Sequence, residues 1–264
     1  MENAEKYAVS QYSDGGLKSS CDVLVTREFP LTLILNNQEL VTLLCSPTNM
    51  EYLAAGYLFA EGLIQNSSDI KNITTDEKRG VVRVTTPEGL EFAHELLYKR
   101  LITSACGRGA AFYTAADAQH PEKVESQIVI TPKEVFTLVE EFTHYSEVYK
   151  STSGVHSAAL SDTRKILVFH DDLGRHNAVD KVFGHCLLAG LPTRDHVVIT
   201  SGRTPSEMIL KVAKGKAPIL VSIAAPTDLG IRLANDLGIT LIGLVRNKKM
   251  NVYTNGWRVP DESK

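Results

Sequence analysis

Residues 196–245 decide the fold, and they read HVVITSGRTPSEMILKVAKGKAPILVSIAAPTDLGIRLANDLGITLIGLV. Short apolar runs alternate here with longer segments that have polar starts, which is typical of buried strands followed by helices. The predicted strands are 196–200, 218–223 and 240–245, and the predicted helices are 205–213 and 227–237. Strands that alternate with helices build a layered α/β sheet.

The same alternation of strands and helices extends upstream to about residue 131. Helices are expected over 131–144 and 175–189, with strands at 157–160 and 165–170 between them. The first of these helices begins with TPKE, where Pro132 is well placed in the first turn. The pattern therefore predicts one α/β domain over residues 131–264.

The first half of the chain has a different pattern, with several strands around one helix. Residues 1–19 are expected to form a loose arm, and 114–130, which contain Pro121, a linker. The predicted strands are 22–26, 30–35, 39–44, 80–85 and 90–93, and the predicted helix is 50–61. Residues 1–130 are thus predicted to be a small α+β domain that ends in the Cys106 loop and the linker.

Composition excludes several classes of protein. The 264 residues are 43% hydrophobic and 22% charged, and no apolar run reaches the roughly 20 residues of a membrane span. The polar N-terminus lacks the features of a secretory signal, so we expect a cytoplasmic protein. The net charge is −3 without an arginine-rich run, so nucleic acid is not implied.

The four cysteines are far apart in sequence: they are Cys21, Cys45, Cys106 and Cys186. None forms a CxxC pair, which argues against a zinc ribbon and a thioredoxin-type motif, and no metal site is expected. Cys106 lies in TSACGRG, residues 103–109, where glycines free the backbone and Arg108 favours the thiolate. A small buried cysteine in a tight turn is an equally good interpretation of this segment alone.

Three polar patches could bind a ligand. His156 lies in SGVHSAAL (153–160), where a core histidine is the simpler interpretation. DDLGRHNAVDK (171–181) follows a predicted strand and crowds Arg175 and His176 into a helix start. TSGRTPSE (200–207) also follows a strand.

In that last patch Ser201, Gly202 and Thr204 could cradle an anion that Arg203 clamps. Ligand sites of α/β folds form where strands of one sheet end. The two patches that follow strands therefore predict a phosphate-bearing ligand, in particular a nucleotide.

Six segments, in order, resemble the FdhD/NarQ family of formate dehydrogenase accessory sulfurtransferases. They are GYLFAEGLI (56–64), the Cys-Gly segment, SGVHSAAL (153–160), DLGRHNAVDK (172–181), SGRTPSEM (201–208) and LIGLVRNKKMNVYT (241–254). The resemblance implies a C-terminal domain of three-layer α/β/α, cytidine deaminase-like fold, and a homodimer.

The resemblance also implies a function. A cysteine desulfurase would load a persulfide onto Cys106, and the sulfur would pass to molybdenum bis-molybdopterin guanine dinucleotide before that cofactor enters formate dehydrogenase. The residues expected to bind the cofactor are Leu244, Val245, Arg246, Asn247, Lys248, Lys249, Met250 and Asn251, with Arg203, Ser201, Gly202, Arg175, His176 and His156.

One departure keeps a second function open. Many members carry a second cysteine where this chain has Gly109, so a chaperone that binds the cofactor without sulfur transfer is an alternative. A zinc deaminase fits poorly, because Ala158 stands where an HxE motif needs glutamate and PCxxC is missing. A nucleotide hydrolase that uses Asp171 and Asp172 would lack a P-loop.

Overall fold

The computed structural model describes residues 3–87, 100–102, 110–112 and 122–260, with the backbone alone at 100–102 and 110–112. The predicted strand 90–93 lies outside these ranges, and so does Cys106. Among the helices that are described, none combines the length and apolar character needed to cross a membrane.

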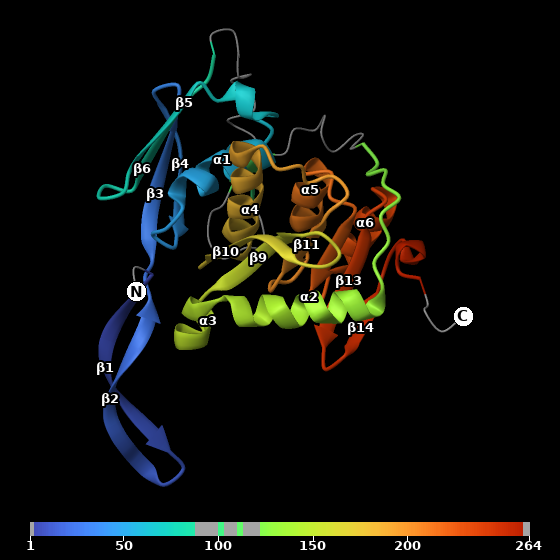
Figure 1. The fold of residues 1–264 in the computed structure, drawn as a ribbon. Coiled ribbons are helices and arrows are strands. Elements are labelled where there is room, and N and C mark those ends of the chain that lie inside the picture. The colour runs from blue at the N-terminus through green and yellow to red at the C-terminus, as the bar shows by residue number, and fades with distance from the viewer. Residues whose placement is uncertain (1–2, 88–99, 103–109, 113–121, 261–264) are drawn as a thin grey trace.

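A six-stranded sheet forms the larger part of the molecule (Figure 1). Its strands, in order across the sheet, are β10 (Ile166–Asp172), β9 (His156–Ser161), β11 (Val197–Thr200), β12 (Ile219–Ser222), β13 (Thr240–Arg246) and β14 (Lys249–Val252). β11, β12 and β13 are parallel, whereas β9 is antiparallel to both of its neighbours. The carboxyl ends of β10, β11, β12 and β13 therefore share one edge of the sheet with the start of β9.

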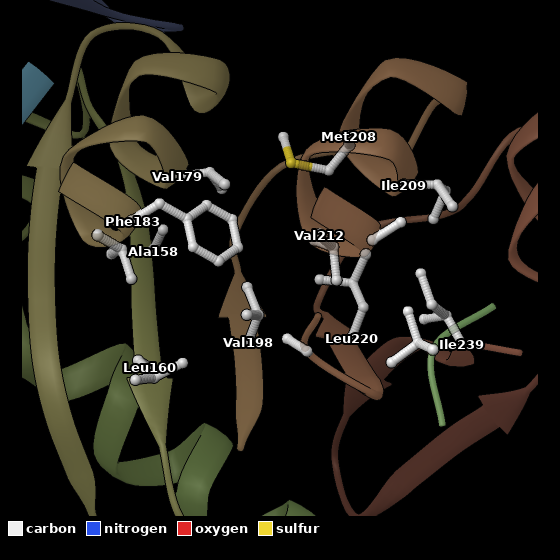
Figure 2. Close-up of a cluster of buried hydrophobic side chains, with 14 of the residues drawn as sticks. Ala158, Leu160, Val179, Phe183, Val198, Met208, Ile209, Val212, Leu220 and Ile239 are labelled. Atoms are coloured by element: carbon white, nitrogen blue, oxygen red, sulfur yellow. The ribbon is translucent and has the colours of Figure 1, made fainter. Parts of the chain in front are cut away.

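Helices cover both faces of this sheet, so the predicted α/β fold is confirmed. α2 (Pro132–Tyr145) packs on one face, where its Leu138 and Phe142 share a core with Ile199. The other face carries α4 (Arg175–Ala189), α5 (Ser206–Lys214) and α6 (Asp228–Asp236). Figure 2 shows the ring of Phe183, on α4, directed toward Val198 of β11.

The N-terminal part is built around a four-stranded sheet. Its strand order is β4 (Gln38–Cys45), β3 (Phe29–Leu35), β6 (Val81–Thr85) and β5 (Asn72–Asp76). α1 (Met50–Ala60) buries Leu53 and Leu58 against this sheet and also packs along α4. β5 was not predicted, because NITTD has little apolar character.

The connection to the larger sheet is partly described. Val124 packs in the core on the α4 side of the six-stranded sheet, and Ile130 packs on the α2 side. Residues 124 and 130 therefore contact the larger sheet, and the domain division at residue 130 stays a prediction.

The expectation of a loose arm at 1–19 is wrong. β1 (Ala4–Ser13) and β2 (Gly16–Thr26) form an antiparallel hairpin that projects from the body (Figure 1). Asp14-Gly15 connects the strands, and this dipeptide favours two-residue hairpin turns. The signal was present in the sequence, but the polar composition around it obscured the strands.

Several short elements were also not expected. They are α3 (Glu147–Thr152), the strand pair β7 (Arg100–Ile102) and β8 (Ala110–Phe112), β14, and the 3₁₀ turns Ser67–Asp69 and Gly256–Arg258. α3 follows α2 directly and lies beside the sheet edge at which β10 and β11 end, so it bears on the site.

Candidate functional site

A pocket of about 490 Å³ opens at the edge where β11 and β12 end. One wall comes from the sheet, through His156, Ser157 and Ser201. The opposite wall comes from the end of α2 and from α3, through Ser146 and Tyr149. The structure brings His156 and Ser201 together at this edge, although they are 45 positions apart.

A hydrogen-bonded group at the sheet edge fixes the imidazole of His156. The backbone N–H of Ser157 donates to Ser201 Oγ at 2.9 Å, and Ser201 Oγ lies 3.2 Å from His156 Nδ1. Ser201 Oγ can donate to Nδ1 or accept from it, according to the tautomer of the ring.

The environment of His156 favours the neutral ring. Burial lowers the pKa of His156, and the positive charge of Arg175 lowers it further, while Asp172 acts in the opposite direction. At neutral pH the pocket wall therefore presents an uncharged hydrogen-bonding ring. None of the described residues that line the pocket is Asp, Glu, Lys or Arg.

Arg175 lies against Gly202, just outside this lining. A Cβ at Gly202 would be 2.6 Å from Cβ of Arg175 and 2.8 Å from its Cδ. Glycine at 202 thus gives the arginine side chain its place next to the β11 loop. The Arg175 Nε is buried and has no hydrogen-bond partner among the described residues, so this donor is unsatisfied.

The loop after β11 uses three of its backbone N–H groups within the protein. The N–H of Ser201 donates to Ser157 O, that of Gly202 to Thr200 Oγ1, and that of Thr204 to Ala225 O. These three donors are not available to an anion near this loop, so side chains would have to contribute to its binding. Arg203 is exposed on the loop, where it can contribute its charge.

His176 is not among the residues that line the pocket. Its Nε2 lies 3.6 Å from Glu207 Oε2, too far for a hydrogen bond. Burial, then the charges of Lys211 and Arg175, lower the pKa of His176 to about 3. A neutral ring at this distance forms no ion pair, so His176 packs between α4 and α5.

Other polar residues of the 171–181 patch hold the fold together. Lys181 Nζ lies 2.7 Å from Asp172 Oδ2, and both side chains are fully buried. The same carboxyl oxygen accepts from the backbone N–H of Ser46 at the end of β4. Asp172 therefore ties the small sheet to α4, the helix that begins at Arg175.

The stretch 244–251 forms the tip of the β13–β14 hairpin. Asn247 and Lys248 both have positive φ angles and make the turn. Arg246, Lys248 and Lys249 are exposed there, so the tip is basic. Leu244 also has a positive φ of 55°, and its N–H donates to Ala224 O in the loop that follows β12. The hairpin thus borders the same sheet edge as the pocket.

Comparisons with known proteins agree with this architecture. The sequence model of the FdhD/NarQ family matches residues 26–260. The chain belongs to the FdhD/NarQ family. It is 44% identical over 253 residues to the sulfur carrier protein FdhD of Bacillus subtilis (strain 168), covering 95% of each chain. It is 38% identical to that of Bacillus pumilus (strain SAFR-032), covering 97% of this chain and 98% of the relative.

The fold is also that of a solved structure described as a formate dehydrogenase accessory protein, from Desulfotalea psychrophila. The TM-score is 0.79 at 28% identity, with 97% of this chain and 99% of the other covered. The family resemblance expected from the six segments is therefore confirmed over most of the chain.

The cysteines can be compared only in part, because Cys106, the expected sulfur carrier, lies outside the described residues. Burial raises the pKa of Cys45 to about 12, and burial also raises that of Cys186 to about 12. Neither can supply a thiolate at neutral pH. Cys21 is half-buried on β2 of the projecting hairpin.

Sequence reasoning missed the wall formed by α3. Ser146 and Tyr149 line the pocket, yet nothing in EVYKST marks a ligand site. The one available signal was the spacing of Phe142, Tyr145 and Tyr149 along two consecutive helices. Among the described residues, no three His, Cys, Asp or Glu side chains are gathered so that they could hold a metal ion.

Proposed function

We propose that this protein is a sulfur carrier that serves a formate dehydrogenase. It accepts sulfur from a cysteine desulfurase on Cys106 and passes it to molybdenum bis-molybdopterin guanine dinucleotide before the cofactor enters the enzyme. The cofactor is a bound substrate here, and a homodimer in the cytoplasm is the expected form. Relatives with 38–44% identity are named sulfur carrier proteins, which supports the assignment.

The observation that carries the proposal is the pocket of about 490 Å³ at the sheet edge. Its volume suits part of a dinucleotide cofactor. Hydroxyl groups, the neutral His156 and apolar side chains line it, which fits an uncharged heterocycle better than a phosphate. The guanine end of the cofactor, which is planar and forms hydrogen bonds, is therefore proposed to enter the pocket.

The phosphates are proposed to stay outside, beside the positive charges at the same edge. Arg175 has a buried Nε without a described partner, and Arg203 is exposed on the β11 loop. The basic tip of the β13–β14 hairpin, with Arg246, Lys248 and Lys249, borders the same edge. Guanidinium groups bind phosphate through paired N–H donors, which suits the pyrophosphates of the cofactor.

The sulfur chemistry requires one thiolate at a time. The thiolate of Cys106 attacks the outer sulfur of the desulfurase persulfide, an S–S bond forms at Cys106, and the desulfurase cysteine leaves as a thiolate. In the next transfer an electron pair of the acceptor attacks the outer sulfur, the S–S bond breaks, and Cys106 leaves as a thiolate. Because residue 109 is glycine, this chain lacks the neighbouring thiol that many members are expected to have. Neither step needs a second cysteine.

Intact mass under non-reducing conditions tests the proposal, after incubation with a cysteine desulfurase and cysteine. Wild type and the matched control Cys21→Ala should gain one sulfur atom that a reductant removes, whereas Cys106→Ala should gain none. A gain in Cys106→Ala would place the sulfur elsewhere and refute the assignment.

Gly109 favours one second candidate, a chaperone that binds the cofactor without carrying sulfur. It predicts no mass gain in any variant, together with intact binding of guanosine diphosphate (GDP), which represents the guanine nucleotide end of the cofactor. Calorimetric titration with GDP in parallel with the mass measurement separates the two functions.

A further inference from the structure

Asp171 forms hydrogen bonds with one residue of each wall of the pocket. It lies near the end of β10, and its Oδ1 accepts from Ser157 Oγ at 2.5 Å while its Oδ2 accepts from Ser146 Oγ at 2.5 Å. Such short O–H···O⁻ contacts are typical of charge-assisted hydrogen bonds. Ser146 and Ser157 line the pocket, but Asp171 itself does not.

On one side, Asp171 controls the start of α3. Ser146 separates α2 from α3, and its Oγ accepts from the N–H of Tyr149, so its hydroxyl proton goes to Asp171. α3 has only six residues, which is too short to be stable by itself. Its position therefore depends on the contacts at its two ends.

At its other end α3 has an independent anchor. Thr26 Oγ1, at the base of the projecting hairpin, donates to Thr152 Oγ1 at 2.9 Å. Loss of the Asp171 contact would thus free the first turn of α3, where Tyr149 forms the wall, while the last turn stays attached.

On the other side, Asp171 holds the sheet edge. It pairs with Ser157 in the β9–β10 register, and the Ser157 N–H donates to Ser201 Oγ, the atom next to His156. One carboxylate therefore bonds to both walls, and through Ser157 it stands next to the group that orients the imidazole.

We propose that Asp171 is a positioning residue, which holds α3 against the sheet edge and thereby sets the width of the pocket that receives the cofactor. The proposal rests on the binding function proposed for this pocket. Asp171 does not touch the ligand; it acts through Ser146 and Ser157.

The test combines amide hydrogen exchange with GDP titration on the full chain, for wild type, Asp171→Ala and Asp171→Asn. In Asp171→Ala, amides of residues 147–152 should exchange about tenfold faster and the Kd for GDP should rise about tenfold, because two hydrogen bonds are lost. α2 should keep its protection. Asp171→Asn retains one acceptor oxygen and should recover part of the affinity, a graded rescue that general destabilisation would not produce.

Two further variants serve as a control and as a replacement. Glu147→Gln removes a carboxylate that pairs with Lys150 on the surface of α3, and it should leave both measurements unchanged. Ser157→Ala breaks the sheet-side bond and also removes one hydroxyl group from the pocket wall; it replaces Asp171→Ala if that variant does not fold, and it should raise the Kd by a smaller factor. Wild-type affinity in Asp171→Ala, or in Ser157→Ala where that variant replaces it, would overturn the positioning role alone. Failure of wild type to bind GDP would overturn the pocket assignment and the positioning role with it.

Discussion

Gly56 of α1 lies directly against the backbone of Asp180 of α4: a Cβ at Gly56 would be 1.8 Å from the Asp180 carbonyl oxygen. The contact is reciprocal, since a Cβ at Gly184 would be 1.9 Å from the carbonyl oxygen of Tyr52. Two glycines thus let α1 and α4 approach closely, and this helix pair joins the small sheet to the large one.

Alanine at Gly184 should therefore destabilise the protein by about 3 kcal/mol, because the added methyl group meets backbone that cannot rotate away. Urea unfolding measures the change. Gly256→Ala is the matched control, since its nearest neighbour would be 3.6 Å away and the site is exposed. A loss at Gly184 no larger than that of the control would show that the helices can separate at little cost.

Removal of Lys181 should be more damaging than removal of a surface lysine. Lys181→Met leaves the fully buried Asp172 carboxylate without its cation, and such losses cost about 3–5 kcal/mol. Lys216→Met removes an exposed lysine whose Glu122 partner is also exposed, so it should change the free energy of unfolding by less than about 1 kcal/mol. Equal effects in urea unfolding would mean that water reaches Asp172.

Stability should fall as the pH drops below about 6.5. Burial lowers the pKa of His170 to about 3, helped by His185 and Lys181, and burial lowers that of His176 to about 3. A depressed folded pKa means that the unfolded chain binds more protons, so stability is complete above the unfolded pKa and is lost below it.

At pH 5.5 each of these histidines should cost roughly 1 kcal/mol relative to neutral pH. His170→Gln should flatten the dependence of the free energy of unfolding on pH between 6.5 and 5, whereas the exposed His144→Gln should not. An unchanged slope in His170→Gln would indicate that this ring is protonated in the folded protein.

Thiol labelling should distinguish the cysteines. At pH 7.5 native Cys45 and Cys186 should resist iodoacetamide, because burial raises both pKa values to about 12 and closes access. Cys21, which is half-buried, should react, and Cys106 should react if it is the proposed carrier. Peptide mapping by mass spectrometry reads this out, with urea-unfolded protein as the fully reactive control. Rapid native labelling of Cys45 would reveal opening of the joint between the sheets.

Arg203→Ala should raise the Kd for GDP, because a positive charge beside the phosphates is lost. The rise should be only about fivefold, because this charge is exposed and screened by salt. Arg232→Ala removes another exposed arginine, paired with Asp228 on α6, and should have no effect. Calorimetry at two ionic strengths should show that the difference shrinks in higher salt. Unchanged affinity would remove Arg203 from the proposed site.

Much of the fold was predictable because its signals are local. The helix predicted at 175–189 matches α4, and the strands at 30–35 and 240–245 match β3 and β13 within one residue at each end. The errors occurred where local signals are weak: polar residues hid the β1–β2 hairpin, and α3 is too short to show a period. Of the expected cofactor residues, His156 and Ser201 meet at the pocket, whereas His176 packs between helices.

By itself, the sequence determined the α/β class, the family, and the placement of polar patches after strands of one sheet, because periodicity and motif order are properties of neighbouring residues. Only the tertiary structure decided which polar groups are free. The N–H groups of Ser201 and Thr204 donate to Ser157 and Ala225, and Asp172 is bonded to Ser46 across 126 positions. Hydrogen-bond partners are set by packing between distant segments, and this information is absent from any local pattern.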